Sequence, residues 1–127
     1  MATLKISDLS VGDWVEYETM PTKVMNINGF DSVVRGKASN GNIVIAHIDC
    51  FKPIPITTEI LEKNGFESIS QLSIMYRYRT DITVAEYYSG LWGFGIGVPC
   101  NDLAALHGVH TLQHAMRLAG AEKEINL

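Results

Sequence analysis

The chain has 127 residues, 46% hydrophobic and 19% charged, which is the composition of a globular domain able to bury a core. Its 14 acidic and 10 basic residues give a net charge of −4, which argues against general affinity for nucleic acid. No apolar run reaches the roughly 20 residues that cross a bilayer. The segment Met1–Asp8 lacks the apolar core of a signal peptide, so we expect a cytoplasmic protein.

The first half of the sequence predicts short strands separated by turns. The expected strands cover residues 11–18, 22–28, 32–38 and 42–48. Asn28–Gly29 and Asn40–Gly41 are strong turn signals. Alternation places Trp14 and Val15 on opposite faces of the first strand, and we expect Trp14 to belong to the core. Four or five short strands within about 45 residues indicate a small, bent antiparallel barrel of the SH3-like kind.

The second half predicts a short helix, a β-meander and a C-terminal helix. Thr57 or Thr58 can cap a helix over 59–64, and Gly65 is a natural stop. The meander is expected over 69–78, 82–88 and 91–98, with turns at Thr80–Asp81 and Ser89–Gly90. Pro99 ends its last strand, and Asn101 or Asp102 is expected to cap the final helix. Gly108 interrupts that helix, so it can begin as late as Val109.

The fold class is therefore α+β: an N-terminal SH3-like small β-barrel followed by a short helix, a β-meander and a C-terminal helix. We treat residues 1–127 as a single α+β domain, with a barrel-like lobe over about 1–55 and a helix–meander–helix lobe over about 56–127.

Histidines gather on one side of the expected C-terminal helix. At about 100° per residue, an apolar side forms from Ala105, Val109, Leu112, Met116 and Ala119. His107, His110, His114 and Arg117, here called the histidine face, lie nearly opposite. His110 and His114 have the spacing of the H-E-x-x-H zinc motif, but Thr111 replaces its glutamate and no third ligand is indicated, so we assign no metal site. The same face could hold a phosphate or carboxylate, although pairing of Arg117 with an acidic neighbour is favoured.

A glycine- and aromatic-rich segment, residues 87–99, precedes that helix. Its Tyr88 or Trp92 could stack on a flat ligand while helix amides meet a phosphate. It matches neither the P-loop nor the dinucleotide-binding pattern. The favoured interpretation is a core strand whose glycines allow another element to approach closely.

Two further features concern aromatic and sulfur chemistry. In the segment 76–79, tyrosines and arginines alternate, a pattern that can bind single-stranded nucleic acid on a sheet. Because there are only two of each on an acidic chain, a half-buried strand with a solvated arginine face is favoured. Cys50 and Cys100 form no C-x-x-C pair, and we expect reduced, mostly buried thiols. No catalytic triad can be assembled, so no catalytic residue and no cofactor are assigned.

Four segments together resemble a known group of proteins. They are Leu9–Val15, 53–66, Val109–His114 and Gly120–Ile125. The group comprises small, uncharacterised proteins of Bacteroidetes phages, prophages and mobile elements. The resemblance implies a cytoplasmic protein made by a virus or mobile element in a bacterial host. Within the group the pattern is V-H-x-L-Q, and asparagine can replace His114, which implies that His110 and Gln113 hold structure or a common contact.

These observations give an order of expected functions. We expect a non-enzymatic binding protein of a phage or mobile element that acts on a host or phage protein. The alternative is a counter-defence sponge that sequesters a nucleotide-like signal; a nucleic-acid adaptor and a metal-dependent hydrolase follow. The candidate ligand-binding residues are Tyr88, Trp92, His107, His110, His114 and Arg117. A homodimer is expected only because small symmetric assemblies are common.

Overall fold

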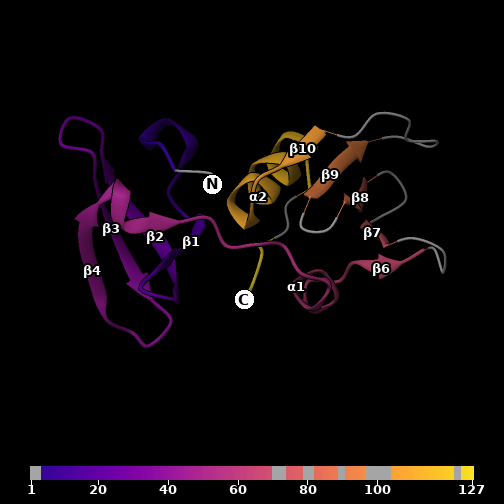
Figure 1. Ribbon diagram of the computed structural model, residues 1–127, viewed down its shortest axis with the longest axis horizontal. Helices are drawn as coiled ribbons and strands as arrows, with labels where there is room; N and C mark the ends of the chain where they lie inside the picture. Colours follow the sequence, from indigo (N-terminus) through magenta and orange to yellow (C-terminus); the bar gives the residue numbers. More distant parts are fainter. Residues whose placement is uncertain (1–3, 70–73, 79–81, 89–90, 97–103, 122–123) are drawn as a thin grey trace. The chain divides into compact units, whose positions relative to one another are not determined.

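The computed structural model describes residues 4–69, 74–78, 82–88, 91–96, 104–121 and 124–127. Over these residues the chain is an α+β protein with two five-stranded antiparallel sheets and two α-helices (Figure 1). It divides into two compact units, Met1–Ile54 with Gly108–His110, and Pro55–His107 with Thr111–Leu127. That the two form a single domain stays a prediction. No helix in the described segments is long and apolar enough to cross a membrane.

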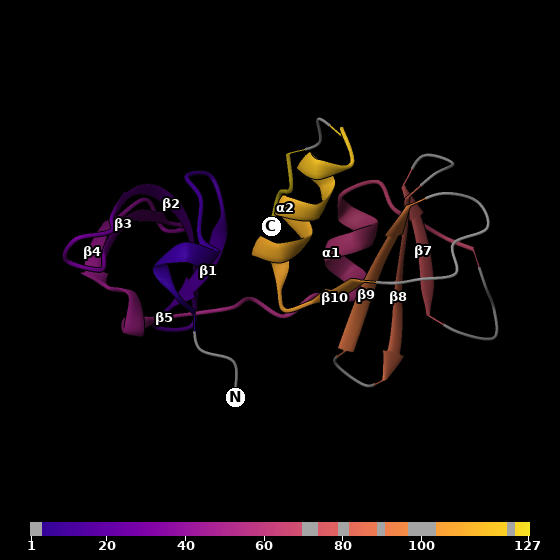
Figure 2. The same cartoon turned by 90° about the horizontal axis from the view of Figure 1, so that it is seen from above.

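The first unit is built on a curled antiparallel sheet with the strand order β4-β3-β2-β1-β5 (Figure 2). Its strands are β1 (Trp14–Tyr17), β2 (Met20–Asn28), β3 (Val33–Ala38), β4 (Ile43–His47) and β5 (Phe51–Lys52). Short 3-10 turns lie at Ile6–Asp8 and Ile48–Cys50. The buried core of this unit consists of Leu4, Leu9, Val15, Val24, Val34, Ile48 and Phe51. Side chains alternate along the strands, so one face meets this core and the other faces outward. The exception is at Met25 and Asn26 of β2, where the pairing with β3 shifts and both side chains are exposed.

The expectation that Trp14 belongs to the core is wrong. Val15 is fully buried, whereas Trp14 is half-buried on the opposite face of β1. Because side chains of a strand alternate with a period of two, burial of Val15 directs its neighbour outward. Trp14 therefore lies on the outer face of the sheet.

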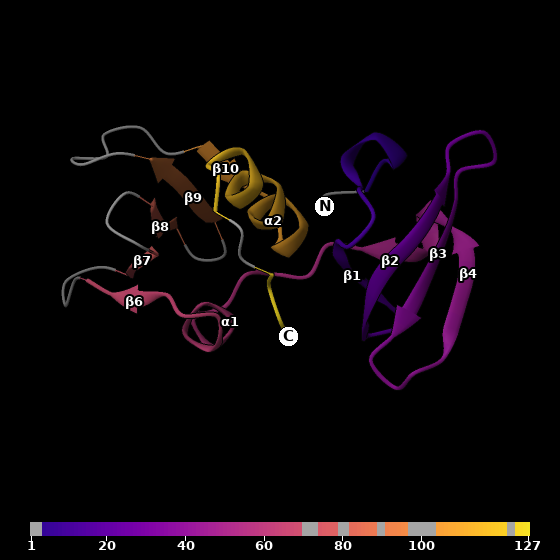
Figure 3. The same cartoon turned by 180° about the vertical axis from the view of Figure 1, so that it is seen from behind.

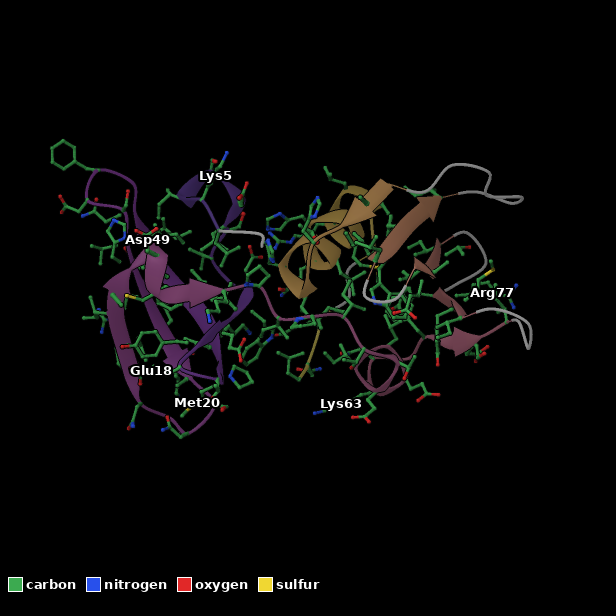
Figure 4. All side chains as sticks on the ribbon, viewed as in Figure 1. Lys5, Glu18, Met20, Asp49, Lys63 and Arg77 are labelled. Carbon is green, nitrogen blue, oxygen red and sulfur yellow. The ribbon has the colours of Figure 1, made fainter. Side chains whose placement is uncertain are left out.

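Two of the three turns of the first sheet described here contain asparagine or glycine residues that favour a turn. Ala38 and Asn42 pair around Asn40–Gly41, where Gly41 has a φ of 91°. The Asn28 side chain accepts hydrogen bonds from two backbone N–H groups of the next loop. Sequence reasoning missed the hairpin between β1 and β2. Its turn is Glu18–Thr19, with φ values of 48° and 66°. Figure 4 shows Glu18 and Met20 at the same end of this sheet.

The second unit begins with α1 (Thr58–Lys63), whose cap was anticipated. The Thr57 side chain accepts a hydrogen bond from the Ile60 N–H at 3.2 Å, which satisfies one of the free amides at the helix start. Asn64 ends the helix and ties down the C-terminal segment, because its side chain donates to Asn126 O at 2.8 Å and accepts from Asn126 N–H at 2.7 Å.

The second sheet is a meander with the order β10-β9-β8-β7-β6. Its strands are β6 (Glu67–Ser68), β7 (Met75–Tyr78), β8 (Ile82–Tyr88), β9 (Leu91–Ile96) and β10 (Ala104–Leu106). The expected strand over 69–78 is confirmed only for β7, which begins at Met75. The Ile69 N–H donates to Met75 O at 3.0 Å, so these two residues do not belong to one extended strand, and β6, which precedes the expected range, pairs with β7. Both helices lie on one side of this sheet (Figure 2). The expected turns at 80–81 and 89–90 lie outside the described residues.

The C-terminal helix, α2 (Val109–Leu118), begins where Gly108 interrupts the periodicity. The expectation that it includes Ala105 is wrong, because Ala104–Leu106 pairs with β9 as β10 (Figure 3). The capping positions Asn101 and Asp102 lie outside the described residues. Gly120, with a φ of 76°, ends the helix, and the Ala121 N–H donates to Met116 O at 2.9 Å. This is the Schellman arrangement, which favours glycine after a helix.

The structure also corrects the expectation for the cysteines. Cys50 is a free, exposed thiol after β4, and Cys100 lies outside the described residues.

Candidate functional site

The histidine face does not form one continuous surface. His107 precedes α2 and is exposed, and its backbone N–H donates to Thr111 Oγ1 at 2.8 Å. His110 is only 2% exposed and Gln113 only 8%, whereas His114 is half-buried and Arg117 is exposed. The polar side of the predicted helix is therefore divided by burial. That His110 and Gln113 hold structure or a common contact, as the resemblance implies, stays a prediction.

The described parts of the chain contain no preformed metal-binding site of protein side chains. Among those residues, no three or more His, Cys, Asp or Glu side chains gather closely enough to hold an ion.

Trp92 lies inside the second unit. Trp92 is on β9, directly opposite Leu106 on β10 and Glu86 on β8, and its side chain is 4% exposed. Its buried indole Nε1 has no hydrogen-bond acceptor among the residues that the structure describes. The ring thus offers no exposed face for stacking. Tyr88 ends β8, and its side chain lies outside the described part of the structure.

The tyrosines of β7 lie toward the interior, as alternation predicts. Tyr76 is buried, Arg77 is exposed (Figure 4) and Tyr78 packs against Phe66 with ring centroids 5.2 Å apart. Burial raises the pKa of Tyr76, and the nearby Glu62 carboxylate raises it further. The Tyr76 hydroxyl donates to Glu62 Oε1 at 3.5 Å. This strand supports the core, and Arg79 lies outside the described residues.

A pocket on the outer face of the first sheet is the strongest candidate site. Its volume is about 590 Å³, within the range typical of small-molecule sites. The residues that line this Trp14 pocket are Val11, Gly12, Trp14, Lys23, Val24, Met25, Lys37, Ala38 and Ser39. All of them belong to the first unit. The lining contains no carboxylate, histidine or cysteine. Its charged groups are the ammonium groups of Lys23 and Lys37, and most of the other lining residues are apolar.

Strand register assembles the charged part of the pocket. Trp14 on β1 is directly opposite Lys23 on β2, and Lys23 is directly opposite Lys37 on β3. The three side chains therefore form a row across three strands. Lys23 Nζ lies 5.9 Å from the centroid of the Trp14 ring, within reach of a cation–π attraction.

A tight turn holds the rim of the pocket. Gly12 has a φ of 95°, a conformation that favours glycine, and its N–H donates to Val24 O at 2.8 Å. The Val24 N–H donates in return to Asp13 O at 2.8 Å. Asp13 is fully buried, and its carboxylate accepts the Ser10 N–H at 2.8 Å. These bonds fix the segment before Trp14 against β2, so the aromatic wall is held in place.

The electrostatics of the row favour an anion. Like charges directly opposite each other on neighbouring strands are destabilising. Lys23 and Lys37 occupy such positions. A negative group placed between their ammonium groups would relieve this repulsion. The exposed apolar side chains at the rim, Val11 at 62% and Met25 at 43%, would at the same time contact an apolar part of the ligand.

Sequence reasoning noted Trp14 but missed both lysines. The available signal was the alternation of Arg35 and Lys37 along β3, which predicts a charged outer face. Their position beside Trp14 depends on the pairing of β1, β2 and β3, and the first of these pairings depends on the unforeseen Glu18–Thr19 turn. Comparison with known proteins adds no further assignment. No protein-family model, curated protein or solved structure matches the chain.

Proposed function

We propose that this chain is a non-enzymatic binding protein that holds a negatively charged, partly apolar group of its partner in the Trp14 pocket. The observation that carries the proposal is the row of Trp14, Lys23 and Lys37 across three strands. The row supplies an aromatic surface and two positive charges. Apart from Ser39 and the two lysines, the residues that line the pocket carry no nucleophilic or titratable side chain, which favours binding over catalysis.

The proposal keeps the biological setting that the resemblance implies: a phage or mobile-element protein that acts in the bacterial cytoplasm on a host or phage protein. That setting rests on the four resembling segments alone. The proposal also places the first unit among SH3-like barrels, and the curled antiparallel sheet of five short strands supports this.

A nucleotide-like small molecule is the second candidate ligand, which would make the protein a sponge. The volume of the pocket and its combination of an aromatic ring with ammonium groups favour this candidate. Native mass spectrometry of protein purified from its host distinguishes the two sources. A co-purifying small mass supports the sponge, whereas the bare chain or a complex with another protein supports the protein partner.

The shared chemistry can be tested before the ligand is known. Anilinonaphthalene sulfonate combines flat rings with one negative charge, and phenylnaphthylamine has the same rings without the charge. We expect saturable, one-to-one binding of the sulfonate and at least tenfold weaker binding of the neutral compound. Reversal of one charge about 5 Å from an anion changes the binding free energy by about 1–2 kcal/mol, so Lys37→Glu is expected to weaken sulfonate binding about tenfold.

Lys52→Glu is the matched control, because it makes the same charge change on β5 of the same sheet, outside the pocket. It should leave sulfonate binding unchanged. Equal affinity for the charged and neutral compounds would refute the anion-binding proposal. Equal weakening by both lysine reversals would refute it as well, because the effect would then come from net charge rather than from the pocket.

A further inference from the structure

The outer edge of β4 adjoins the Trp14 pocket, because Lys37, which lines the pocket, is directly opposite Ile43 at this edge. The Ala38 N–H donates to Asn42 O and the Ile48 N–H donates to Ser32 O, each at 2.8 Å. Between these two bonds the register of β3 and β4 is uninterrupted. Opposed residues in an antiparallel pair alternate between bonded and non-bonded, so Val44 and Ala46 bond to β3. Ile43, Ile45 and His47 therefore direct their backbone N–H and C=O groups away from β3.

No described strand lies beside that edge, since β4 ends the sheet. Proteins normally protect such edges with short strands, charged residues, prolines or bulges. The opposite edge of the same sheet follows this rule, because β5 has only two residues and one of them is Lys52. β4 does not follow it, because its five residues, Ile43–His47, include no lysine, arginine, acidic residue or proline. Ile43 is 46% exposed and Ile45 is 66% exposed.

The charged side chains beside this edge determine which kind of strand can bind to it. Arg35 is directly opposite Ile45 and Lys37 is directly opposite Ile43, and both cations are exposed. Neither has an ion-pair partner among the residues that the structure describes. A strand added to β4 would lie about 10 Å from β3, twice the strand spacing. Extended acidic side chains on that strand could reach the two cations across the isoleucines.

The inner face of β4 determines which residues fit at the alternate positions of an added strand. Val44 and Ala46 are half-buried and pack against the core of the first unit. Residues of an added strand beside them would point to the same face, where aliphatic side chains would extend the core. The two faces together specify an alternation of aliphatic and acidic residues.

We propose that the β4 edge binds an extended segment of a partner protein in which aliphatic and acidic residues alternate. The segment forms backbone hydrogen bonds with Ile43, Ile45 and His47, and its acidic side chains pair with Arg35 and Lys37. Charge favours this occupant over a second copy of the chain. Pairing of two β4 strands about Ile45 would place two sets of these cations on one face and would add no acidic residue from either strand.

The test uses NMR on the full chain with a capped peptide of about seven residues in which valine and glutamate alternate. A second peptide, in which lysine replaces glutamate, is the matched ligand control. We expect the amide protons of Ile43, Ile45 and His47 to exchange rapidly in the free protein and to become protected by the acidic peptide. We expect the lysine peptide to bind at least tenfold more weakly.

Two variants and one control complete the experiment. Ile45→Glu, which places a carboxylate opposite the glutamates of the acidic peptide, is expected to weaken binding of that peptide at least tenfold. Arg35→Glu, which leaves one positive and one negative charge beside the edge, is expected to remove the preference between the peptides. Ile96→Glu, which makes the same change at an exposed isoleucine of β9, should bind like the wild type. Peptide binding without protection of the three amides, or unaffected by both variants, would overturn the proposal. A dimer that protects these amides without peptide would overturn it in favour of a second copy.

This proposal can fail separately from the proposed function. Ile45 does not line the Trp14 pocket, so Ile45→Glu should leave binding of anilinonaphthalene sulfonate unchanged.

Discussion

Reversing the charge of Lys37 should stabilise the free protein while it weakens anion binding. Lys23 and Lys37 are directly opposite on neighbouring strands. If their flexible ends separate to about 8 Å in water, the repulsion is about 0.5 kcal/mol. Lys37→Glu replaces that repulsion with an attraction of similar size. We therefore expect the free energy of unfolding to rise by about 1 kcal/mol, or the melting temperature by about 4 °C.

The assay is urea unfolding at low salt, followed by the fluorescence of Trp14 in a Trp92→Phe background. With a Debye length of about 10 Å at 0.1 M and 3 Å at 1 M, most of the gain should disappear in high salt. Lys52→Glu is the control of opposite sign, because Lys52 lies directly opposite Glu16 and the change creates a like-charge pair. If Lys37→Glu fails to stabilise the protein, or if both reversals change stability in the same direction, the reasoning about the row is wrong.

Three further predictions concern stability. Replacing the turn Glu18–Thr19 by Asn-Gly should stabilise the protein by about 1 kcal/mol in urea unfolding, because both positions have positive φ; a loss would contradict the assigned turn. Gly36→Ala should destabilise it by about 1–3 kcal/mol, because the added Cβ would lie 2.6 Å from a threonine methyl on β2; a neutral result would contradict this close approach. Burial and Glu62 raise the pKa of Tyr76 in the folded state. The contribution of neutral Tyr76 to the free energy of unfolding is therefore complete below about pH 10 and is lost as the pH rises above that. Tyr76→Phe should therefore lose less stability than the wild type between about pH 8 and 11, and equal losses would refute this.

The sequence alone was sufficient to predict those elements and helix ends that depend on residues close together in the chain. Thr57 caps α1 because its hydroxyl can satisfy a free amide, and Gly120 ends α2 because glycine adopts positive φ without strain. The strands β1 to β4 fall within or overlap the expected β-rich segments. Each of these features depends on residues within a few positions of one another.

Features that depend on pairing with distant residues could not be predicted. Ala104–Leu106 has helix-forming residues but forms a strand, because β9 provides a partner. His110 appears on the polar side of a helical projection but is buried. The pattern of β1 showed two faces, yet the burial of Val15 decides which of them meets the core.

The candidate site was missed for the same reason. Its lysines are 14 residues apart in the sequence, Lys23 and Lys37, and the register of two strands places them opposite each other. None of the candidate ligand-binding residues named from the sequence is among those that line the pocket, and two of them, Trp92 and His110, are buried. The chemistry of single side chains identifies those candidates, whereas the pocket depends on two lysines that strand pairing places beside Trp14.

The most direct test of the central claim is to observe where an anionic aromatic compound binds. In a nitrogen-15 spectrum the two indole N–H signals can be assigned with Trp92→Phe. On titration with anilinonaphthalene sulfonate, we predict that the Trp14 indole signal and the amides of Gly12 and Ser39 shift, while the Trp92 signal does not move. Saturable binding that leaves the Trp14 signal unchanged would contradict the assignment of this pocket as the binding site.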